Sequence, residues 1–180
     1  MKEKHSLIVI ILFVILTIVC CKSIAQGSVG LSASLDNRLT FAEDDAGNTP
    51  FTLDITGKVS LQGYQKSAGF TQISVKYEYA DLASGEFHRY GVEAGYMFTF
   101  TRSNSIGLMP FAGYGILGRE GDYARRSWEF GSMAFIRIIP CLKLITSAVF
   151  TERTDLPDVG FRLNLNTGLQ FDIDTNYLNK

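Results

Sequence analysis

Hydrophobic and polar residues alternate one by one along most of the chain. In the most regular stretch, Phe161, Leu163 and Leu165 alternate with Arg162 and Asn164. A period of two places hydrophobic side chains on one face of a β-strand, whereas an amphipathic helix repeats about every 3.6 residues. Eight stretches share the pattern: 28–36, 53–62, 72–79, 89–100, 106–116, 125–138, 142–150 and 158–171. The alternation predicts an all-β protein of eight strands, of which 142–150 is the least regular.

The connections between these stretches differ in length. Those after the second, fourth and sixth stretches are short: 65–69, 101–104 and 139–141. The others are as long or longer, and the first of them is the longest: 38–51, 81–85, 118–123 and 152–157. Short connections between neighbours predict an antiparallel up-and-down meander. If both chain ends lie in the periplasm, the short connections are periplasmic turns and the longer ones are extracellular loops.

Glycines indicate which face of the sheet points inward, because they gather on the polar face: Gly91, Gly95, Gly107, Gly113, Gly115, Gly131, Gly160 and Gly168. An eight-stranded barrel is barely wide enough for the side chains of its interior, so small residues suit that face. The large hydrophobic residues on the other face are too many for one small core and suit contact with lipid. We therefore predict an eight-stranded antiparallel up-and-down transmembrane β-barrel. A soluble secreted barrel that binds an apolar ligand is the alternative.

The N-terminus has the features of a secretory signal peptide. Two lysines precede an apolar run at 7–21, and the small residues Ser23 and Ala25 fit the positions before a cleavage site. The run is shorter than the ~20 residues that a membrane-spanning helix needs. A retained anchor and a lipidated cysteine are the alternatives. We expect three parts: a cleaved signal peptide at 1–25, an outer-membrane barrel at 26–173 and a C-terminal tail at 174–180.

The charge balance excludes one class of partner. Of 17 basic and 18 acidic residues, three and one respectively lie within 1–25, which leaves a mature charge of −3. Binding to nucleic acid needs a basic stripe, so we expect no nucleic-acid partner. After cleavage Cys141 is the one remaining cysteine, so no internal disulfide is expected.

Two short phrases support a resemblance to a known group of proteins. Gly91–Tyr96 reads GVEAGY and Phe111–Tyr114 reads FAGY, which are Gly-aromatic phrases common in membrane barrels. The mature chain resembles the small outer-membrane barrels of the OmpA and OmpX kind, and a fainter likeness is to conjugal-transfer barrel proteins of Bacteroides transposons. The Ala25-Gln26 junction resembles exported proteins of Bacteroidota. The resemblance implies the outer membrane of a Gram-negative bacterium of that group. Phe171 is followed by nine residues, unlike the usual terminal aromatic residue of such barrels.

The predicted lumen contains charges of both signs. The inward positions form the candidate site: Asp54, Lys58, Lys76, Glu78, Arg89, Glu93, Glu129, Arg137 and Arg162. In a narrow interior of low dielectric constant, isolated charges are costly, so we expect these groups to pair and close the lumen. The alternative is a narrow channel for ions or small solutes, gated by the same pairs.

The longest loop is the candidate surface for interactions, with Glu43, Asp44, Asp45 and Asn48. These residues lack the spacing of a calcium loop, so we expect a solvated, charged tip. His88 is the one histidine of the mature chain and has no serine beside it in a catalytic motif, so we expect no enzyme, no metal and no cofactor. The predicted function is a structural or surface-interaction role. The predicted partners are outer-membrane lipid and proteins at the extracellular loops or periplasmic turns.

Overall fold

The computed structural model describes residues 27–38, 48–63, 69–83, 85–101, 103–119, 124–154 and 160–174. The predicted signal peptide and nearly all of the predicted tail lie outside these residues. The described residues form eight strands: β1 (Ser28–Asp36), β2 (Asp54–Gln62), β3 (Gly69–Leu82), β4 (Gly85–Thr99), β5 (Ile106–Arg119), β6 (Arg125–Ile139), β7 (Leu142–Glu152) and β8 (Phe161–Asp174).

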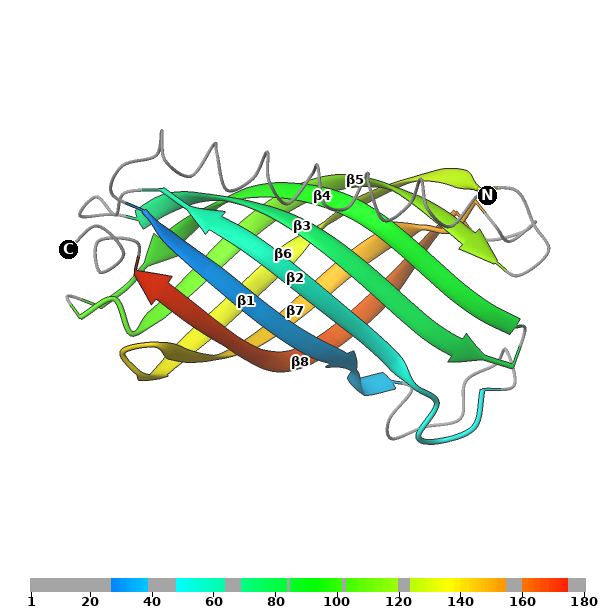
Figure 1. Cartoon of the computed structure of the whole chain (residues 1–180), viewed down its shortest axis with the longest axis horizontal. Helices are drawn as coiled ribbons and strands as arrows, with labels where there is room; N and C mark the ends of the chain where they lie inside the picture. Colours follow the sequence, from blue (N-terminus) through cyan, green and yellow to red (C-terminus); the bar gives the residue numbers. More distant parts are fainter. Residues whose placement is uncertain are drawn as a thin grey trace, which may run out of the picture.

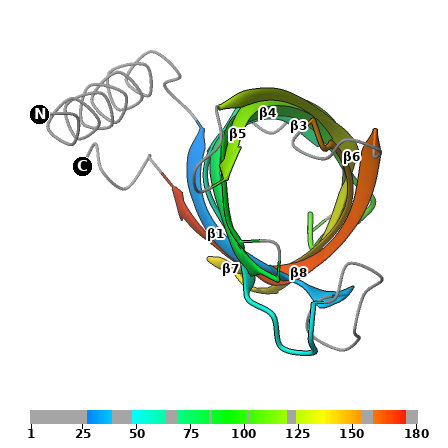
Figure 2. The same ribbon diagram turned by 90° about the vertical axis from the view of Figure 1, so that its right-hand side faces the viewer.

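The eight strands close into a barrel in chain order. Each strand pairs antiparallel with the next, and β1 pairs with β8, so that Ser28 faces Asp174 and Asp36 faces Asn166. The strands run obliquely to the long axis of the molecule and form a complete ring when seen from one end (Figures 1 and 2). This architecture confirms the predicted eight-stranded up-and-down barrel. No helix in the described part of the chain is long and apolar enough to cross a membrane.

The two ends of the barrel differ in their connections. The turn end has the connections β2–β3, β4–β5 and β6–β7, and the loop end has the other four, which include the longest connection, β1–β2. The connection between β3 and β4 is shorter than predicted. Leu82 and Gly85 still pair with each other, and the turn there uses the left-handed φ of +102° at Gly85, which glycine adopts without strain.

The outer wall of the barrel is apolar. Large hydrophobic side chains on every strand are more than a third exposed: Leu31, Ile55, Ile73, Tyr90, Leu108, Phe130, Leu144 and Leu169. The alternate positions point into the barrel and are mostly buried. This orientation agrees with the predicted register, in which the apolar face lies outside.

Glycines on the inner wall mark places where adjacent strands approach closely. A Cβ atom on Gly168 would lie 2.0 Å from the carbonyl oxygen of Ala33, and one on Gly131 would lie 2.3 Å from that of Ala148. At these two positions the obstacle is the backbone of the neighbouring strand, whereas a Cβ atom on Gly113 would lie 2.5 Å from Oε1 of Glu129 in the lumen. Glycine permits the tight curl that closes so small a barrel.

Candidate functional site

Charged side chains of the inner wall meet in the half of the lumen nearer the loop end. Alternation turns Lys76 and Glu78 of β3, Arg89 of β4 and Glu129 of β6 inward, and each is at most 5% exposed. A charge so far from water is stable only when opposite charges and hydrogen bonds surround it. The positions of these four residues follow from strand parity, and their contacts follow from the curvature of the barrel.

Arg89 lies at the centre of this group. Its Nη1 donates to Oε2 of Glu129 at 2.6 Å and lies 3.9 Å from Oε2 of Glu78, while its Nε donates to Oγ of Ser127 at 3.3 Å. Nζ of Lys76 donates to the same Glu129 oxygen and lies 3.7 Å from Oε2 of Glu78. Two cations and two carboxylates therefore share one buried site, with charge-assisted hydrogen bonds between them.

A second ion pair crosses the lumen beside the first group. Nζ of Lys58 on β2 donates to both oxygens of Glu93 on β4, at 2.8 and 3.0 Å. Lys58 and Lys76 stand directly opposite each other in the β2–β3 ladder, where like charges repel. Glu93 binds one lysine and Glu129 the other, which relieves that repulsion. We call these residues the ion cluster: Lys58, Lys76, Glu78, Arg89, Glu93 and Glu129.

The half of the lumen nearer the turn end is filled differently. A buried group of hydrophobic side chains, which we call the apolar cluster, occupies it: Phe70, Met97, Met109, Phe111, Met133, Phe135, Ile145 and Val149. This cluster is not predicted from the alternation, which indicates a polar inward face. Three methionines at inward positions were the available signal, since methionine is a frequent filler of irregular cores.

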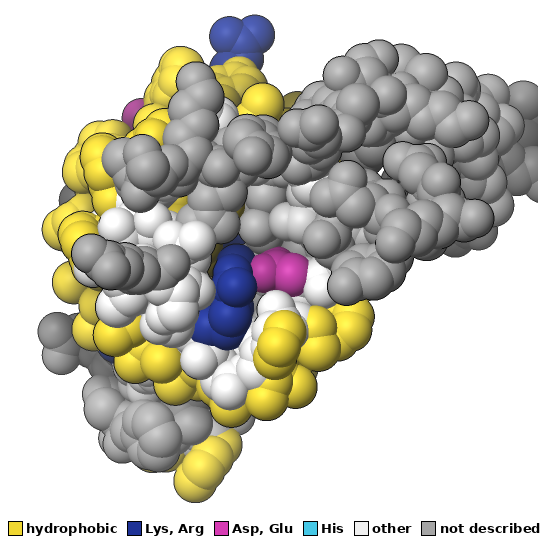
Figure 3. Space-filling view, turned by 90° about the vertical axis from the view of Figure 1, so that its left-hand side faces the viewer, with side chains coloured by type: hydrophobic (Ala, Val, Ile, Leu, Met, Phe, Trp, Pro, Cys, Tyr) yellow, Lys and Arg dark blue, Asp and Glu magenta, His cyan; other side chains and the backbone are white. Residues whose placement is uncertain are grey.

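A further ion pair lies at the turn end of the apolar cluster. Nζ of Lys143 lies 2.6 Å from Oδ2 of Asp172 and 4.7 Å from the ring centre of Phe135. The side-chain amides of Gln62 and Gln170 donate to Oδ1 of Asp172 at 2.9 and 2.7 Å. Seen from this end, basic and acidic side chains lie next to each other in the opening, and hydrophobic side chains lie along the left and lower margin of the molecule (Figure 3). The alternation of the sequence predicts both Lys143 and Asp172 on the inward face, although they lie outside the candidate site named above.

Three predicted residues lie apart from the ion cluster. Asp54 is buried at the loop end of β2, where it forms no ion pair with a described residue. Arg137 is half-buried near the turn end, opposite Lys143 in the β6–β7 ladder. Arg162 is half-buried on β8, opposite Thr151. Arg137 and Glu129 share a face of β6, but eight residues of strand hold them about 26 Å apart.

The predicted interaction loop is described only in part. Glu43, Asp44 and Asp45 lie outside the described residues. Asn48, which we expected at an exposed tip, is only 2% exposed, and its Oδ1 accepts a hydrogen bond from the backbone N–H of Ala83 at 2.8 Å. The difference has a simple cause: the asparagine side chain replaces a missing backbone partner at the β3–β4 turn.

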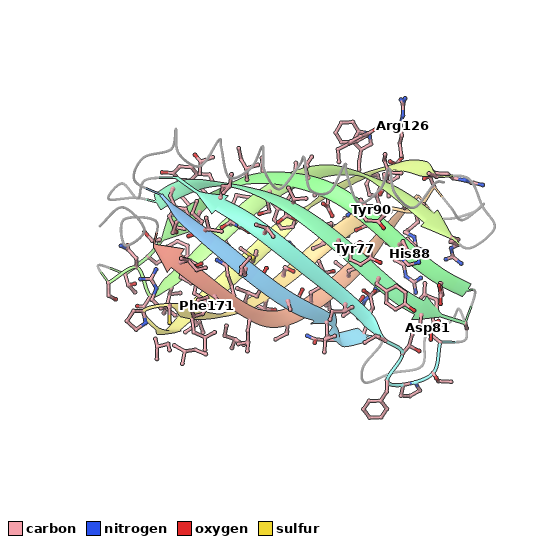
Figure 4. All side chains as sticks on the ribbon, in the orientation of Figure 1. Tyr77, Asp81, His88, Tyr90, Arg126 and Phe171 are labelled. Carbon is pink, nitrogen blue, oxygen red and sulfur yellow. The ribbon has the colours of Figure 1, made fainter. Side chains whose placement is uncertain are left out.

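His88 lies on the outer wall near the loop end, next to Tyr77 and Tyr90 (Figure 4). Its Nδ1 is 2.8 Å from the hydroxyl oxygen of Tyr77, and its Nε2 is 3.8 Å from Oε2 of Glu86. Tyr77 and Tyr90 pack with their ring centres 4.9 Å apart. This arrangement is typical of an aromatic girdle. Among the described residues, no three histidine, cysteine or carboxylate side chains are placed to hold a metal ion.

The sequence matches no protein-family model and no curated protein. Its structure is similar to that of the outer membrane protein Ail of Yersinia pestis in a phospholipid bilayer nanodisc, with a TM-score of 0.55 and 14% identity, over 82% of this chain and 99% of that chain. A crystal structure of Ail, the attachment invasion locus protein, gives a TM-score of 0.47 and 16% identity over 82% of this chain and 97% of that one. A crystal structure of Neisserial surface protein A gives a TM-score of 0.46 and 12% identity, over 82% of this chain and 95% of that one.

The similarity to Ail in the nanodisc concerns the fold, since the two sequences share so few residues. It agrees with the closed ring of eight strands and with the apolar outer wall described above. The Bacteroidota origin and the likeness to conjugal-transfer barrels stay predictions. The chain has the fold of the small eight-stranded outer-membrane β-barrels of the OmpA and OmpX kind.

Proposed function

We propose that the chain is an integral protein of a Gram-negative outer membrane, with a closed lumen and a structural or surface-interaction role. The observation that carries this proposal is the contrast between the two walls of one sheet. Hydrophobic side chains cover the outer wall, while paired charges and bulky hydrophobic side chains fill the lumen. A bilayer favours the first arrangement, because lipid chains solvate apolar side chains and a closed ring leaves no unpaired strand edge.

The ion cluster supports a closed lumen. Its three cations face three carboxylates, so the buried charges balance without counter-ions from water. A hydrophobic constriction closes a pore to ions because it excludes water. Here the apolar cluster fills the lumen on the turn-end side of the ion cluster. Its residues Met97, Met109 and Met133 are each at most 2% exposed. We therefore propose a charge-paired plug and not a channel.

A role without catalysis is part of the same proposal. Hydrolysis through a covalent intermediate needs a nucleophile with a base beside it and a donor for the developing oxyanion. His88 points away from the lumen and bonds to a tyrosine, whose hydroxyl is a weak nucleophile at neutral pH. We propose that protein partners meet the loop end, where Asp81 and Glu86 are exposed on the β3–β4 hairpin (Asp81 is labelled in Figure 4).

Conductance measurements test the closed lumen. The protein is folded into planar lipid bilayers, and folding is verified by the change in gel migration between unheated and boiled samples. We expect no steady single-channel openings from the wild-type chain. Openings whose size changes in Glu129→Gln, with Asn166→Gln as a matched control outside the ion cluster, would overturn the plug and favour a narrow channel.

A substitution on the outer wall tests the membrane location. Leu165 is 39% exposed and faces outward, while its neighbour Asn164 is buried and accepts a hydrogen bond from Arg38. Leu165→Arg should lower the free energy of unfolding in lipid vesicles by about 2–4 kcal/mol if the site is near the bilayer midplane. The matched control is Leu165→Met. Recovery of the wild-type protein in a soluble fraction without detergent would instead favour a secreted barrel.

A further inference from the structure

The turn that leads into β2 has an unusual residue at its strained position. The backbone N–H of Thr52 donates to the carbonyl oxygen of Thr49 at 3.2 Å, and the Thr52 hydroxyl donates to the same oxygen at 2.7 Å. These bonds define a β-turn with Pro50 and Phe51 at its centre, and Phe51 has a φ of +68°. A turn with proline second and a positive φ third normally places glycine or asparagine at the third position. A bulky residue there is a genuine outlier.

Phe51 is also unfavourably placed with respect to water. Its side chain is 82% exposed, more than any other large hydrophobic side chain among the described residues. The chain therefore tolerates backbone strain and an exposed aromatic ring at one residue, without burial of that ring in its own fold. Strain that persists at an exposed site indicates a function for the residue that causes it.

Hydrogen bonds on both sides of the turn hold it against the β3–β4 hairpin. Before the turn, Oδ1 of buried Asn48 accepts from the backbone N–H of Ala83 at 2.8 Å. After the turn, the carbonyl oxygen of Leu53 accepts from the backbone N–H of Asp81 at 2.9 Å. The ring of Phe51 is therefore presented from a segment that is fixed at both ends, which lowers the entropy lost when the ring binds.

The direction of the segment that enters β2 indicates which surroundings the Phe51 ring contacts. The cyan segment that enters β2 runs outside the ring of strands at the loop end, to the side of the barrel and not over its mouth (Figures 1 and 2). Leu53 and Ile55 follow on the outer wall and are 48% and 37% exposed. Phe51 thus extends the apolar row of β2 sideways, at the level where the strands end.

We propose that Phe51 is a membrane anchor, whose ring inserts into the interfacial region of the bilayer beside the loop end of the barrel. The inference rests on the proposed membrane location of the outer wall. Aromatic side chains favour this region, where the ring contacts acyl chains and the backbone stays near water. The positive φ holds the ring at the side of the barrel, so a relaxed turn with glycine would keep the loop and lose the anchor.

Tryptophan fluorescence in lipid vesicles tests the anchor. Trp128 is the one tryptophan of the chain, so Trp128→Phe gives a background without tryptophan emission. Into this background we introduce Phe51→Trp, with Leu165→Trp as a reporter of the outer wall and Ala83→Trp as a reporter of the exposed β3–β4 turn. Each variant is folded into phosphatidylcholine vesicles with or without brominated acyl chains, which quench tryptophan on contact. Gel migration before and after boiling selects the folded samples.

We expect the Phe51→Trp variant to lose the greater part of its emission in brominated lipid and to resist acrylamide, a quencher dissolved in water. The Ala83→Trp variant should behave in the opposite way. If the Leu165→Trp reporter is quenched by brominated lipid while the Phe51→Trp reporter responds to acrylamide alone, the anchor is wrong and the ring is free for a partner protein. If the Leu165→Trp reporter also escapes brominated lipid, the membrane location itself is wrong.

A second measurement needs no substitution. In the wild-type chain folded into a nanodisc, the ring protons of Phe51 should show nuclear Overhauser contacts with lipid acyl protons, as Leu165 methyl protons should. Contacts from Leu165 without contacts from Phe51 would overturn the anchor even if the Phe51→Trp variant does not fold.

Discussion

The two halves of the lumen use different chemistry to fill the same narrow space. Toward the loop end, the ion cluster places three cations and three carboxylates within a few strands of one another. Toward the turn end, the apolar cluster packs methionine and phenylalanine side chains, as the core of a soluble protein does. The stability of the ion cluster depends on the presence of every charged partner, because an unpaired buried charge is costly. The stability of the apolar cluster depends on how completely its side chains fill the available volume. The halves should therefore respond to substitution in different ways.

The largest effect should come from removal of Glu129, which binds Arg89 and Lys76 at once. Glu129→Ala leaves two buried cations with one carboxylate, Glu78, at longer range. We expect the free energy of unfolding in lipid vesicles to fall by about 3–5 kcal/mol, as for other broken buried ion pairs. Urea titration followed by gel migration measures this. A loss below 1 kcal/mol, in a variant that folds, would show that the pairs are solvated.

A cavity in the apolar cluster should cost slightly less. Met133→Ala removes a side chain that is 2% exposed, and we expect a loss of about 2–5 kcal/mol in the same titration. Glu129 and Met133 lie on one strand about 13 Å apart. The double variant should therefore lose the sum of the two single effects to within about 0.5 kcal/mol. A larger deviation would mean that the two halves are one coupled core.

A smaller effect is expected where neutral groups line the lumen between β2 and β3. Ser60 and Ser74 are 2.9 Å apart at their hydroxyl oxygens, and the Gln72 side-chain amide donates to the Ser60 hydroxyl oxygen at 3.2 Å. Ser60→Ala should reduce the free energy of unfolding by about 1 kcal/mol, the usual net value of a buried neutral hydrogen bond. Ser32→Ala, at a half-buried position of β1, is the comparison.

The smallest effect should come from a joint replacement of one ion pair. Nζ of Lys58 lies 5.3 Å from the ring centre of Phe111, so this pair borders the apolar cluster. Lys58→Met combined with Glu93→Leu should leave the stability nearly unchanged, because apolar pairs often replace buried ion pairs without loss. Glu93→Leu alone should be clearly destabilising, because Lys58 then loses its carboxylate partner while it still stands opposite Lys76. Equal losses in both variants would show that shape and not charge limits this site.

The strands could be predicted from the sequence because a period of two needs no long-range information. Even β7 was found, although Ile145 and Val149 weakened its alternation. The structure explains that weakness, since both residues face inward and belong to the apolar cluster. The weak alternation of this strand is therefore the mark of its hydrophobic lining.

The contacts within the lumen were not predictable in the same way. Parity alone turns Arg89 and Glu129 inward, but their contact spans β4 to β6 and depends on how far each strand slides past the next. The position along the strand also separates Arg137 from Glu129, although the alternation places both on the inward face of β6. The strained turn at Phe51 left no signal either, because an exposed phenylalanine after proline looks ordinary in a loop.

The lysines that face each other across β2 and β3 also bear on how the barrel assembles. A hairpin made of these two strands alone would hold two like charges side by side, with Glu78, 3.7 Å from Lys76, as the one carboxylate beside them. The carboxylates that lie closest to the two lysines, Glu93 and Glu129, arrive with β4 and β6. We therefore expect the lysines to favour the nearly complete ring over partly assembled sheets, because their closest carboxylates are present only in the former.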